Sequence, residues 1–157
     1  MANDGIVGAT TLSWLTHVTL AQAIQPTDSH VFVMLGTNDR ITSVNPEWRS
    51  VYGLFSRLTQ IVRDIRILAP NADITLLSAN AVTQNEGAGS PYAFTMRTVD
   101  TVVRDVAANS LCGFVSQYAL TLQDKIDGEN ITPDGLHPGD PTQRKMFDNL
   151  KDRLQVS

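Results

Sequence analysis

Two short, almost continuous apolar segments constrain the fold of this chain more than any other feature of its sequence. Residues 30–35 (His-Val-Phe-Val-Met-Leu) and 73–79 (Asp-Ile-Thr-Leu-Leu-Ser-Ala) lack the alternation of polar and apolar side chains that a half-exposed strand shows. Segments of this kind are typical of strands that are buried on both faces of a parallel sheet. Residues 112–115 (Cys-Gly-Phe-Val) form a shorter segment of the same type. We therefore predict three buried parallel strands.

Segments with helical periodicity precede and separate these strands. Apolar residues recur at steps of three and four over residues 9–24 and 46–68, and again after Pro91, which predicts three helices. Residues 123–139 are expected to be mostly loop. With a last helix near the end of the chain, the order is αβαβαβα. This order predicts a three-layer α/β/α sandwich with right-handed crossovers, in which sites lie beyond the carboxyl ends of the strands.

The last helix has a clear predicted start. Asp140 is suited to cap it, Pro141 fits its first turn, and Gln143 follows three residues after the cap. The buried stripe of this helix is expected to consist of Phe147, Leu150 and Leu154.

Composition argues against several classes of function. The 157 residues are 42% hydrophobic and 18% charged, which is typical of one globular domain. The formal net charge of −4 predicts no nucleic-acid partner. No apolar run approaches the roughly 18 residues of a membrane span, and the first residues lack a signal-peptide pattern, so no membrane partner is expected. Cys112 lies among apolar residues, which favours a core position over a catalytic thiol.

Three short polar blocks fall where such a sheet places a site. The glycine block, Asn-Asp-Gly-Ile-Val-Gly-Ala-Thr over residues 3–10, precedes the first predicted helix. The asparagine block, Gly-Thr-Asn-Asp over residues 36–39, directly follows the first predicted strand. The histidine block, Asp-Gly-Leu-His-Pro over residues 134–138, precedes the last helix. All three are therefore expected at the carboxyl edge of the sheet.

The chemistry of these blocks is that of acyl transfer. A backbone N–H group at Gly8 and the side-chain amide of Asn38 are suitable donors to a developing oxyanion. Asp134 precedes His137 by three residues, a spacing that lets a carboxylate hold one imidazole nitrogen while the other faces a nucleophile.

In this order the blocks resemble those of the SGNH/GDSL hydrolases. The pattern of that family is Gly-Asp-Ser with the nucleophile, then Asn-x-Gly-x-x-Gly-x-Thr, Gly-x-Asn-Asp and Asp-x-x-His-Pro. The last three match here between residues 3 and 138. The resemblance implies a flavodoxin-like parallel sheet, no required cofactor and no metal. It also implies two oxyanion donors, Gly8 and Asn38, and a catalytic acid and base, Asp134 and His137. Two neighbouring glycines of the same blocks are expected to contribute to ligand binding: Gly5 and Gly36.

The sequence departs from the family pattern because Gly-Asp-Ser occurs nowhere in it. In the family that block ends the first strand, so this strand is expected to be missing as well. We interpret residues 1–157 as a single SGNH-hydrolase-like domain, the C-terminal fragment of a longer chain. Four serines of this chain lack the family context and are not expected to replace the nucleophile: Ser13, Ser43, Ser78 and Ser116.

Two hypotheses of function follow. The favoured one rests on a further resemblance, to the C-terminal domain of phage neck-appendage (tail-spike) proteins. It implies a self-cleaved assembly domain that acts as an intramolecular chaperone, trimerises, and has the upstream part of the same polypeptide as its partner in the host cytoplasm. No esterase turnover is then expected, and the vacant cleft would take a small anionic or nucleotide ligand. The alternative is a serine ester hydrolase, an acyl-esterase or carbohydrate deacetylase, whose Gly-Asp-Ser block lies upstream.

Other charged and aromatic side chains are given structural roles. The long second helix is locally basic, and we expect a solvated face, the alternative being contact with an acidic partner or a phosphate-bearing ligand. Its arginines are Arg49, Arg57, Arg63 and Arg66. The histidines outside the histidine block have no partner motif, so no metal site is predicted at His17 or His30. The tryptophans expected in the core or at an interface are Trp14 and Trp48.

Overall fold

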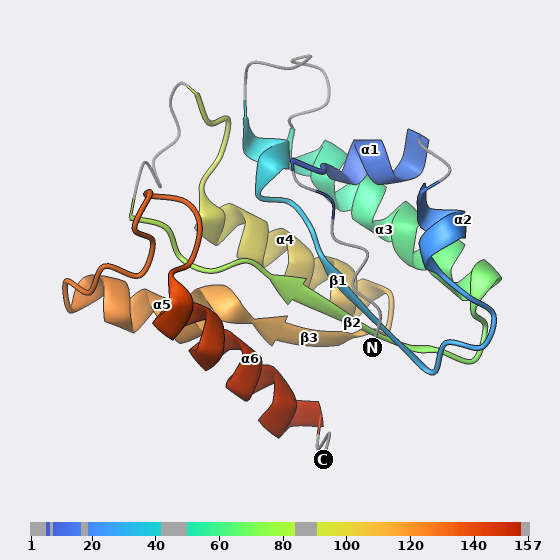
Figure 1. Ribbon diagram of the computed structural model, residues 1–157. Helices are drawn as coiled ribbons and strands as arrows, with labels where there is room; N and C mark the ends of the chain where they lie inside the picture. Colours follow the sequence, from blue (N-terminus) through green and yellow to red (C-terminus); the bar gives the residue numbers. More distant parts are fainter. Residues whose placement is uncertain (1–5, 7, 17–18, 42–49, 84–90, 155–157) are drawn as a thin grey trace.

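A three-stranded parallel sheet forms the centre of the fold (Figure 1). The strands are β1 (His30–Met34), β2 (Asp73–Ser78) and β3 (Gly113–Ser116), and they lie in that order across the sheet. These features come from a computed structural model that describes residues 6, 8–16, 19–41, 50–83 and 91–154. The predicted strands and their parallel direction are confirmed, with ends that differ by one residue.

Helices cover both faces of this sheet, as predicted for a three-layer sandwich. Figure 1 shows α3 (Val51–Leu68) and α4 (Met96–Asn109) behind the sheet and α6 (Asp140–Leu154) in front of it. The helix α5 (Gln117–Ile126) follows β3 directly and packs against α6. Two short helices, α1 (Thr11–Thr16) and α2 (Thr19–Ala23), pack on α3, and a single 3-10 turn, η1 (Asn38–Arg40), follows β1.

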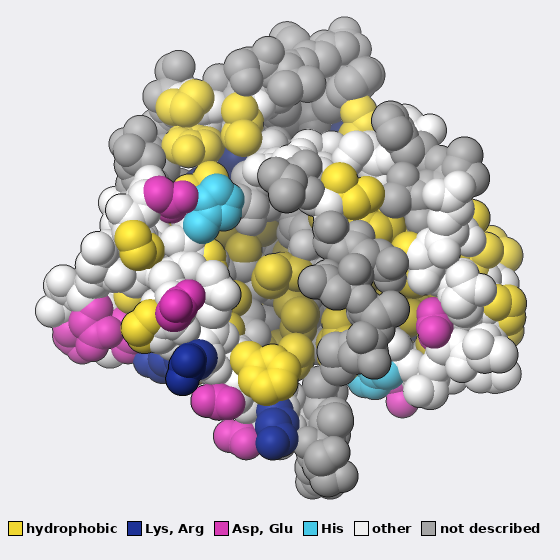
Figure 2. Space-filling view, viewed as in Figure 1, with side chains coloured by type: hydrophobic (Ala, Val, Ile, Leu, Met, Phe, Trp, Pro, Cys, Tyr) yellow, Lys and Arg dark blue, Asp and Glu magenta, His cyan; other side chains and the backbone are white. Residues whose placement is uncertain are grey.

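The main core lies between the sheet and the pair α3 and α4. One side of α3 is buried at every turn, and the facing side of α4 is buried likewise. On β1 the side chains alternate: Val31 and Val33 enter this core, whereas Met34 is 51% exposed. Figure 2 shows hydrophobic side chains in a hollow at the centre of the face that α6 only partly covers. The described residues pair β1 with β2 alone, so no strand described lies along the outer edge of β1.

Local capping explains where the helices differ from the sequence prediction. The helix expected after Pro91 begins only at Met96, because the Thr95 side chain accepts a hydrogen bond from the Thr98 N–H and so forms the cap. Residues 117–126 are helical, so the loop predicted over residues 123–139 is wrong at its first four residues; the Ser116 hydroxyl caps this helix in the same way. The predicted start of α3 at Pro46 lies outside the described residues, and Ser50 caps the described helix.

The predicted buried stripe of α6 is wrong at Phe147, and Leu150 is half-buried. Phe147 is 61% exposed, and the side chain of Leu154 lies outside the described residues. The helix packs on α5, where the Gln117 side chain donates a hydrogen bond to the backbone carbonyl of Met146, and its Thr142 side chain is buried. Asp140 lies in the first turn and does not cap the helix. The carbonyl of Gly139 accepts the first hydrogen bond, from the backbone of Gln143.

The glycine that follows β1 gives a test of the packing. Gly36 has φ +114°, and a Cβ atom there would lie 2.9 Å from Cγ1 of Val99. We expect Gly36→Ala to lower the free energy of unfolding by about 2–4 kcal/mol, because the cost of a positive φ for alanine is added to the cost of overpacking against Val99. Gly128, at φ +86° with open space around it, is the matched control: Gly128→Ala should cost only about 1 kcal/mol. Urea denaturation measures both, and equal losses would contradict the packing argument.

Candidate active site

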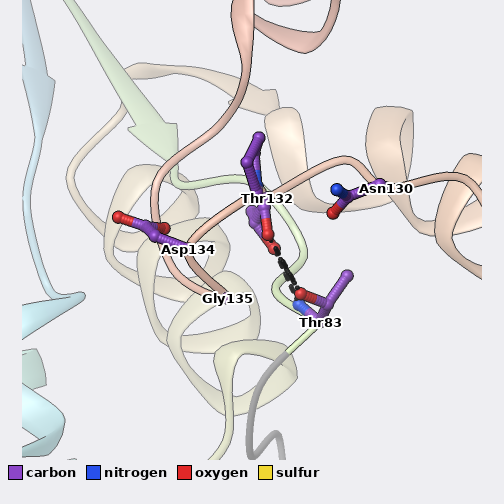
Figure 3. Close-up of a pocket in the computed structure, with 6 residues that line it drawn as sticks. Thr83, Asn130, Thr132, Asp134 and Gly135 are labelled. Carbon is purple, nitrogen blue, oxygen red and sulfur yellow. Dashed lines mark hydrogen bonds between the residues drawn. The ribbon is translucent and has the colours of Figure 1, made fainter.

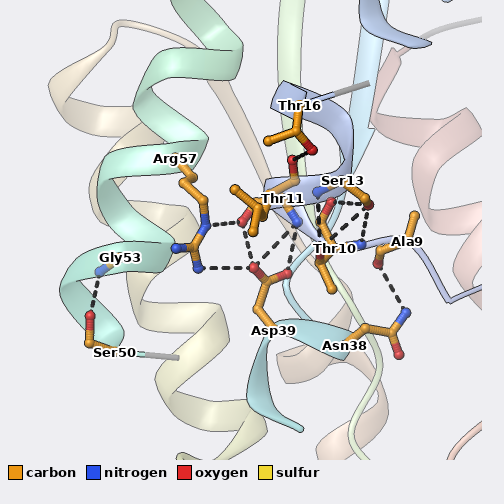
Figure 4. A network of polar contacts seen from close by, with 11 residues as sticks. Ala9, Thr10, Thr11, Ser13, Thr16, Asn38, Asp39, Ser50, Gly53 and Arg57 are labelled. Atoms are coloured by element: carbon orange, nitrogen blue, oxygen red, sulfur yellow. Dashed lines mark hydrogen bonds and ion pairs between the residues drawn. The ribbon is translucent and has the colours of Figure 1, made fainter. Parts of the chain in front are cut away.

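The glycine and asparagine blocks are joined by hydrogen bonds at the start of α1 (Figure 4). The Nδ2 atom of Asn38 donates to the carbonyl oxygen of Ala9 at 3.0 Å. The carboxylate of the next residue, Asp39, accepts from the Thr11 backbone N–H at 3.0 Å and from the Thr11 hydroxyl at 2.5 Å. Two consecutive residues of the asparagine block therefore hold the chain just after Gly8.

A reciprocal cap begins α1 beside these contacts. The Thr10 hydroxyl accepts from the Ser13 N–H at 3.1 Å, and the Ser13 hydroxyl accepts from the Thr10 N–H at 2.8 Å. Ser13 is thus engaged in the cap of α1 through both its hydroxyl and its backbone N–H. Gly8, two residues before the cap, is exposed and has φ +75°, a backbone conformation that favours glycine.

A buried ion pair lies behind this turn and was not foreseen from the sequence. From α3, Arg57 donates through Nε to the Thr11 hydroxyl at 2.7 Å and through Nη2 to Asp39 at 3.2 Å. The side chains of Arg57 and Asp39 are only 13% and 1% exposed. The expectation of a solvated arginine face is therefore wrong at Arg57, because a carboxylate distant in sequence turns its guanidinium inward. Arg63 and Arg66 are exposed, and Arg49 lies outside the described residues.

The histidine block forms a carboxylate–imidazole pair on a tight turn. The Nδ1 atom of His137 lies 2.6 Å from Oδ2 of Asp134, and the other carboxylate oxygen accepts the backbone N–H groups of Leu136 and His137 at 2.9 and 2.7 Å. The hydrogen bond from the His137 side chain, followed by those from the two backbone N–H groups, holds the pKa of Asp134 well below the ordinary value. The imidazole is 75% exposed, so its Nε2 atom stays accessible to a reacting group.

A polar pocket of about 350 Å³ adjoins this turn (Figure 3). Thr83, which follows β2, and Thr132 point toward each other across it, with their hydroxyls 2.7 Å apart and the Thr83 N–H donating to Thr132 at 3.0 Å. This contact ties the histidine-block loop to the loop at the carboxyl end of β2. The pocket is lined by Thr83, Asn130, Thr132, Pro133, Asp134 and Gly135. None of the threonines or Asn130 belongs to a sequence pattern that could have identified it.

The structure brings the glycine and asparagine blocks together, and it forms the Asp134–His137 pair within the histidine block. No hydrogen bond or ion pair among the described residues joins the histidine block to the other two. Gly36 turns its backbone against the core, where Leu54 and Val99 leave no room for a Cβ atom, so its position is explained by packing. Gly5 lies outside the described residues.

The other reactive side chains have structural partners where they are described. The Ser78 and Ser116 hydroxyls both donate to Asp100 at 2.6 Å, and Ser78 is fully buried. Burial raises the pKa of the half-buried Cys112 thiol, against a smaller lowering by the nearby Arg66, and a raised pKa disfavours the reactive thiolate. His30 stacks on Phe32 and lies 3.0 Å from the hydroxyl of Thr75. The serine at 43 and the histidine at 17 lie outside the described residues.

Neither a metal cluster nor a spanning helix is found in the described part of the chain. No three histidine, cysteine, aspartate or glutamate side chains there gather in a way that would hold a metal ion. None of the helices described is long and apolar enough to cross a bilayer. The half-buried side chain of Trp14 packs against the main core, in agreement with its predicted packing role, and Trp48 lies outside the described residues.

A profile of the GDSL-like lipase/acylhydrolase family matches residues 1–145, and the chain belongs to this family. Esterases of this family need no cofactor. Comparison with curated protein sequences gives no match.

Solved structures similar to this one include those of two esterases and a third protein. The acetylxylan esterase Axe2 of Geobacillus stearothermophilus has 17% sequence identity and a TM-score of 0.72, with 98% of this chain and 71% of the esterase covered. A peptidoglycan O-acetylesterase has 21% identity and a TM-score of 0.72, with 94% and 43% covered. A protein of Streptococcus pneumonia provisionally assigned as a platelet activating factor has 25% identity and a TM-score of 0.77, with 98% and 72% covered. These likenesses confirm the SGNH-hydrolase fold. Together with the family match, they favour the hydrolase hypothesis over the tail-spike hypothesis, which with its trimer stays a prediction.

The Asp134–His137 hydrogen bond makes a titration prediction. Because the pKa of Asp134 is lowered from its ordinary value of 3.8, the bond stabilises the folded turn above that pH and loses its effect as the pH falls through the lowered pKa. His137→Ala should raise the pKa of Asp134 toward the ordinary value. Leu136→Ala, which keeps its backbone N–H, should leave the pKa low. Carboxyl ¹³C NMR measures both, and an unchanged pKa in His137→Ala would contradict the assigned cause.

Proposed function

We propose that this chain supplies the oxyanion donors and the acid–base pair of a serine ester hydrolase that removes small acyl groups from carbohydrates. The nucleophilic serine would come from a Gly-Asp-Ser block encoded upstream. The observation that carries the proposal is the 2.6 Å contact between Asp134 and His137, in a chain that belongs to the GDSL-like family.

The acid–base step follows from that contact. With Nδ1 donating to the carboxylate of Asp134, the Nε2 atom of His137 carries the lone pair and accepts the proton of a serine hydroxyl as it attacks the ester carbonyl. The imidazolium that forms is stabilised by the carboxylate, and it then gives the proton to the departing sugar oxygen. In the second half-reaction His137 accepts a proton from water as the water attacks the acyl-enzyme, the proton returns to the serine oxygen, and the carboxylic acid is released.

The oxyanion of the tetrahedral intermediate would be held by Gly8 and Asn38. The Nδ2 atom of Asn38 has two hydrogens, and its bond to Ala9 uses one of them. That bond sets the plane of the amide, and the second hydrogen is left for the oxyanion. The backbone N–H of Gly8 supplies another donor. Each such donor is worth about 3–4 kcal/mol in the transition state.

The polar pocket supports a carbohydrate as the alcohol part of the ester. Its lining offers hydroxyls, an amide and a carboxylate, and it borders the catalytic turn. Groups of this kind hydrogen-bond sugar hydroxyls, whereas an acyl-chain site would be apolar. Two of the similar solved structures are esterases that act on acetylated xylooligosaccharide and on peptidoglycan O-acetyl groups, which agrees with this class of substrate.

Hydrolysis by the full-length gene product tests the proposal. We expect release of acetate from acetylated xylooligosaccharides, with kcat lowered about 10³-fold or more by His137→Ala and about 10²–10³-fold by Asn38→Ala. His30→Gln, on a histidine that packs against Phe32, is the control and should retain turnover. Equal turnover with and without His137 would refute the proposal.

A further inference from the structure

We propose that Arg57 is a positioning residue that fixes the position of one oxyanion donor, the Gly8 N–H, relative to the other, the Asn38 amide. Its value for catalysis rests on the proposed function, but the positioning itself is a property of this chain. The evidence is the network that joins α3, the start of α1 and the asparagine block (Figure 4).

The guanidinium of Arg57 contacts both the start of α1, which follows the glycine block, and the asparagine block. Nε binds the hydroxyl of Thr11, which is 46 residues away in sequence, and Nη2 binds Asp39. The same two partners also bind each other, through the backbone N–H and the hydroxyl of Thr11. The planar guanidinium donates to two partners at fixed angles, whereas a lysine ammonium is a single point charge without this geometry.

The position of this network in the chain connects it to the oxyanion donors. Asp39 follows Asn38 directly, and Thr11 lies three residues after Gly8. The hydrogen bond from Asn38 to Ala9 joins the same two chain segments as the Arg57 network, one residue and two residues away from its contacts. A shift of Thr11 relative to Asp39 would therefore move the Gly8 N–H relative to the Asn38 amide.

The short length of α1 makes this anchoring necessary. A helix of six residues has little stability of its own, and its position depends on tertiary contacts. The contact that Asp39 makes is nearly fully buried, and a buried carboxylate that loses its cation tends to draw in water or to turn outward. Either response would break the hydrogen bonds between Thr11 and Asp39, so that the start of α1 could move relative to the asparagine block. The core between the sheet and α3 would keep its packing.

Amide hydrogen exchange of the ligand-free 157-residue chain tests the proposal. Arg57→Met should speed exchange of the Thr11 N–H by about tenfold or more and bring the two Nδ2 proton signals of Asn38 closer together, with Leu76 of β2 unchanged, because opening is local. Arg57→Lys should give a partial effect. Arg63→Met, on the exposed side of the same helix, should give none.

Two results would overturn the proposal. One is an equal rise of exchange at Thr11 and Leu76, which would indicate a general loss of stability. The other is no change at Thr11. If Arg57→Met does not fold, the same comparison in Arg57→Lys decides. None of these readouts needs a nucleophile or a substrate, so failure of the esterase proposal would leave this test intact.

A kinetic readout applies if the full-length protein hydrolyses esters. Arg57→Lys should then lower kcat by about 10–100-fold with little change in KM, because misplaced donors affect the transition state while the polar pocket is on other loops. A raised KM with unchanged kcat, or an equal loss in Arg63→Met, would contradict the positioning role.

Discussion

The parallel pairing of three buried strands is the constraint on which the rest of this structure depends. Because β1, β2 and β3 run in one direction, the segments that follow β1 and β2 leave the sheet at the same edge. The asparagine block follows β1, and Thr83 after β2 holds the loop of the histidine block through Thr132. Blocks that lie about a hundred residues apart in the sequence are thus carried to one end of the molecule by backbone pairing.

Two polar contacts convert this arrangement into specific geometry. On one side, the buried Arg57–Asp39 pair fixes the start of α1 against the asparagine block. On the other, the two N–H groups and the imidazole that bind Asp134 fix the orientation of His137. The first contact is shielded from water and contributes rigidity. The second is largely exposed, so it sets the tautomer and direction of the imidazole more than it stabilises the fold.

The sequence predicted the sheet well because strands buried on both faces need continuous apolar residues. The three-residue spacing of Asp134 and His137 likewise indicated the contact that the two side chains make, while the catalytic roles of the three blocks stay predictions. The sequence failed where side-chain partners decide the outcome. A helix with several arginines normally faces water, and nothing local shows that Arg57 meets a carboxylate of another element. The apolar spacing of α6 suggested Phe147 as a core residue, whereas Phe147 is exposed and the Met146 backbone of this helix binds Gln117 of α5. The Thr83–Thr132 contact likewise joins residues 49 positions apart.

The central claim is that Asp134 and His137 serve a serine outside these 157 residues. Labelling of the full-length protein with a fluorophosphonate, followed by mass spectrometry of the modified peptide, tests this most directly, since such reagents react preferentially with an activated serine. The account predicts one modified serine, in a Gly-Asp-Ser sequence upstream of residue 1, and no labelling in His137→Ala. Modification of a serine within residues 1–157, or labelling that does not depend on His137, would contradict it.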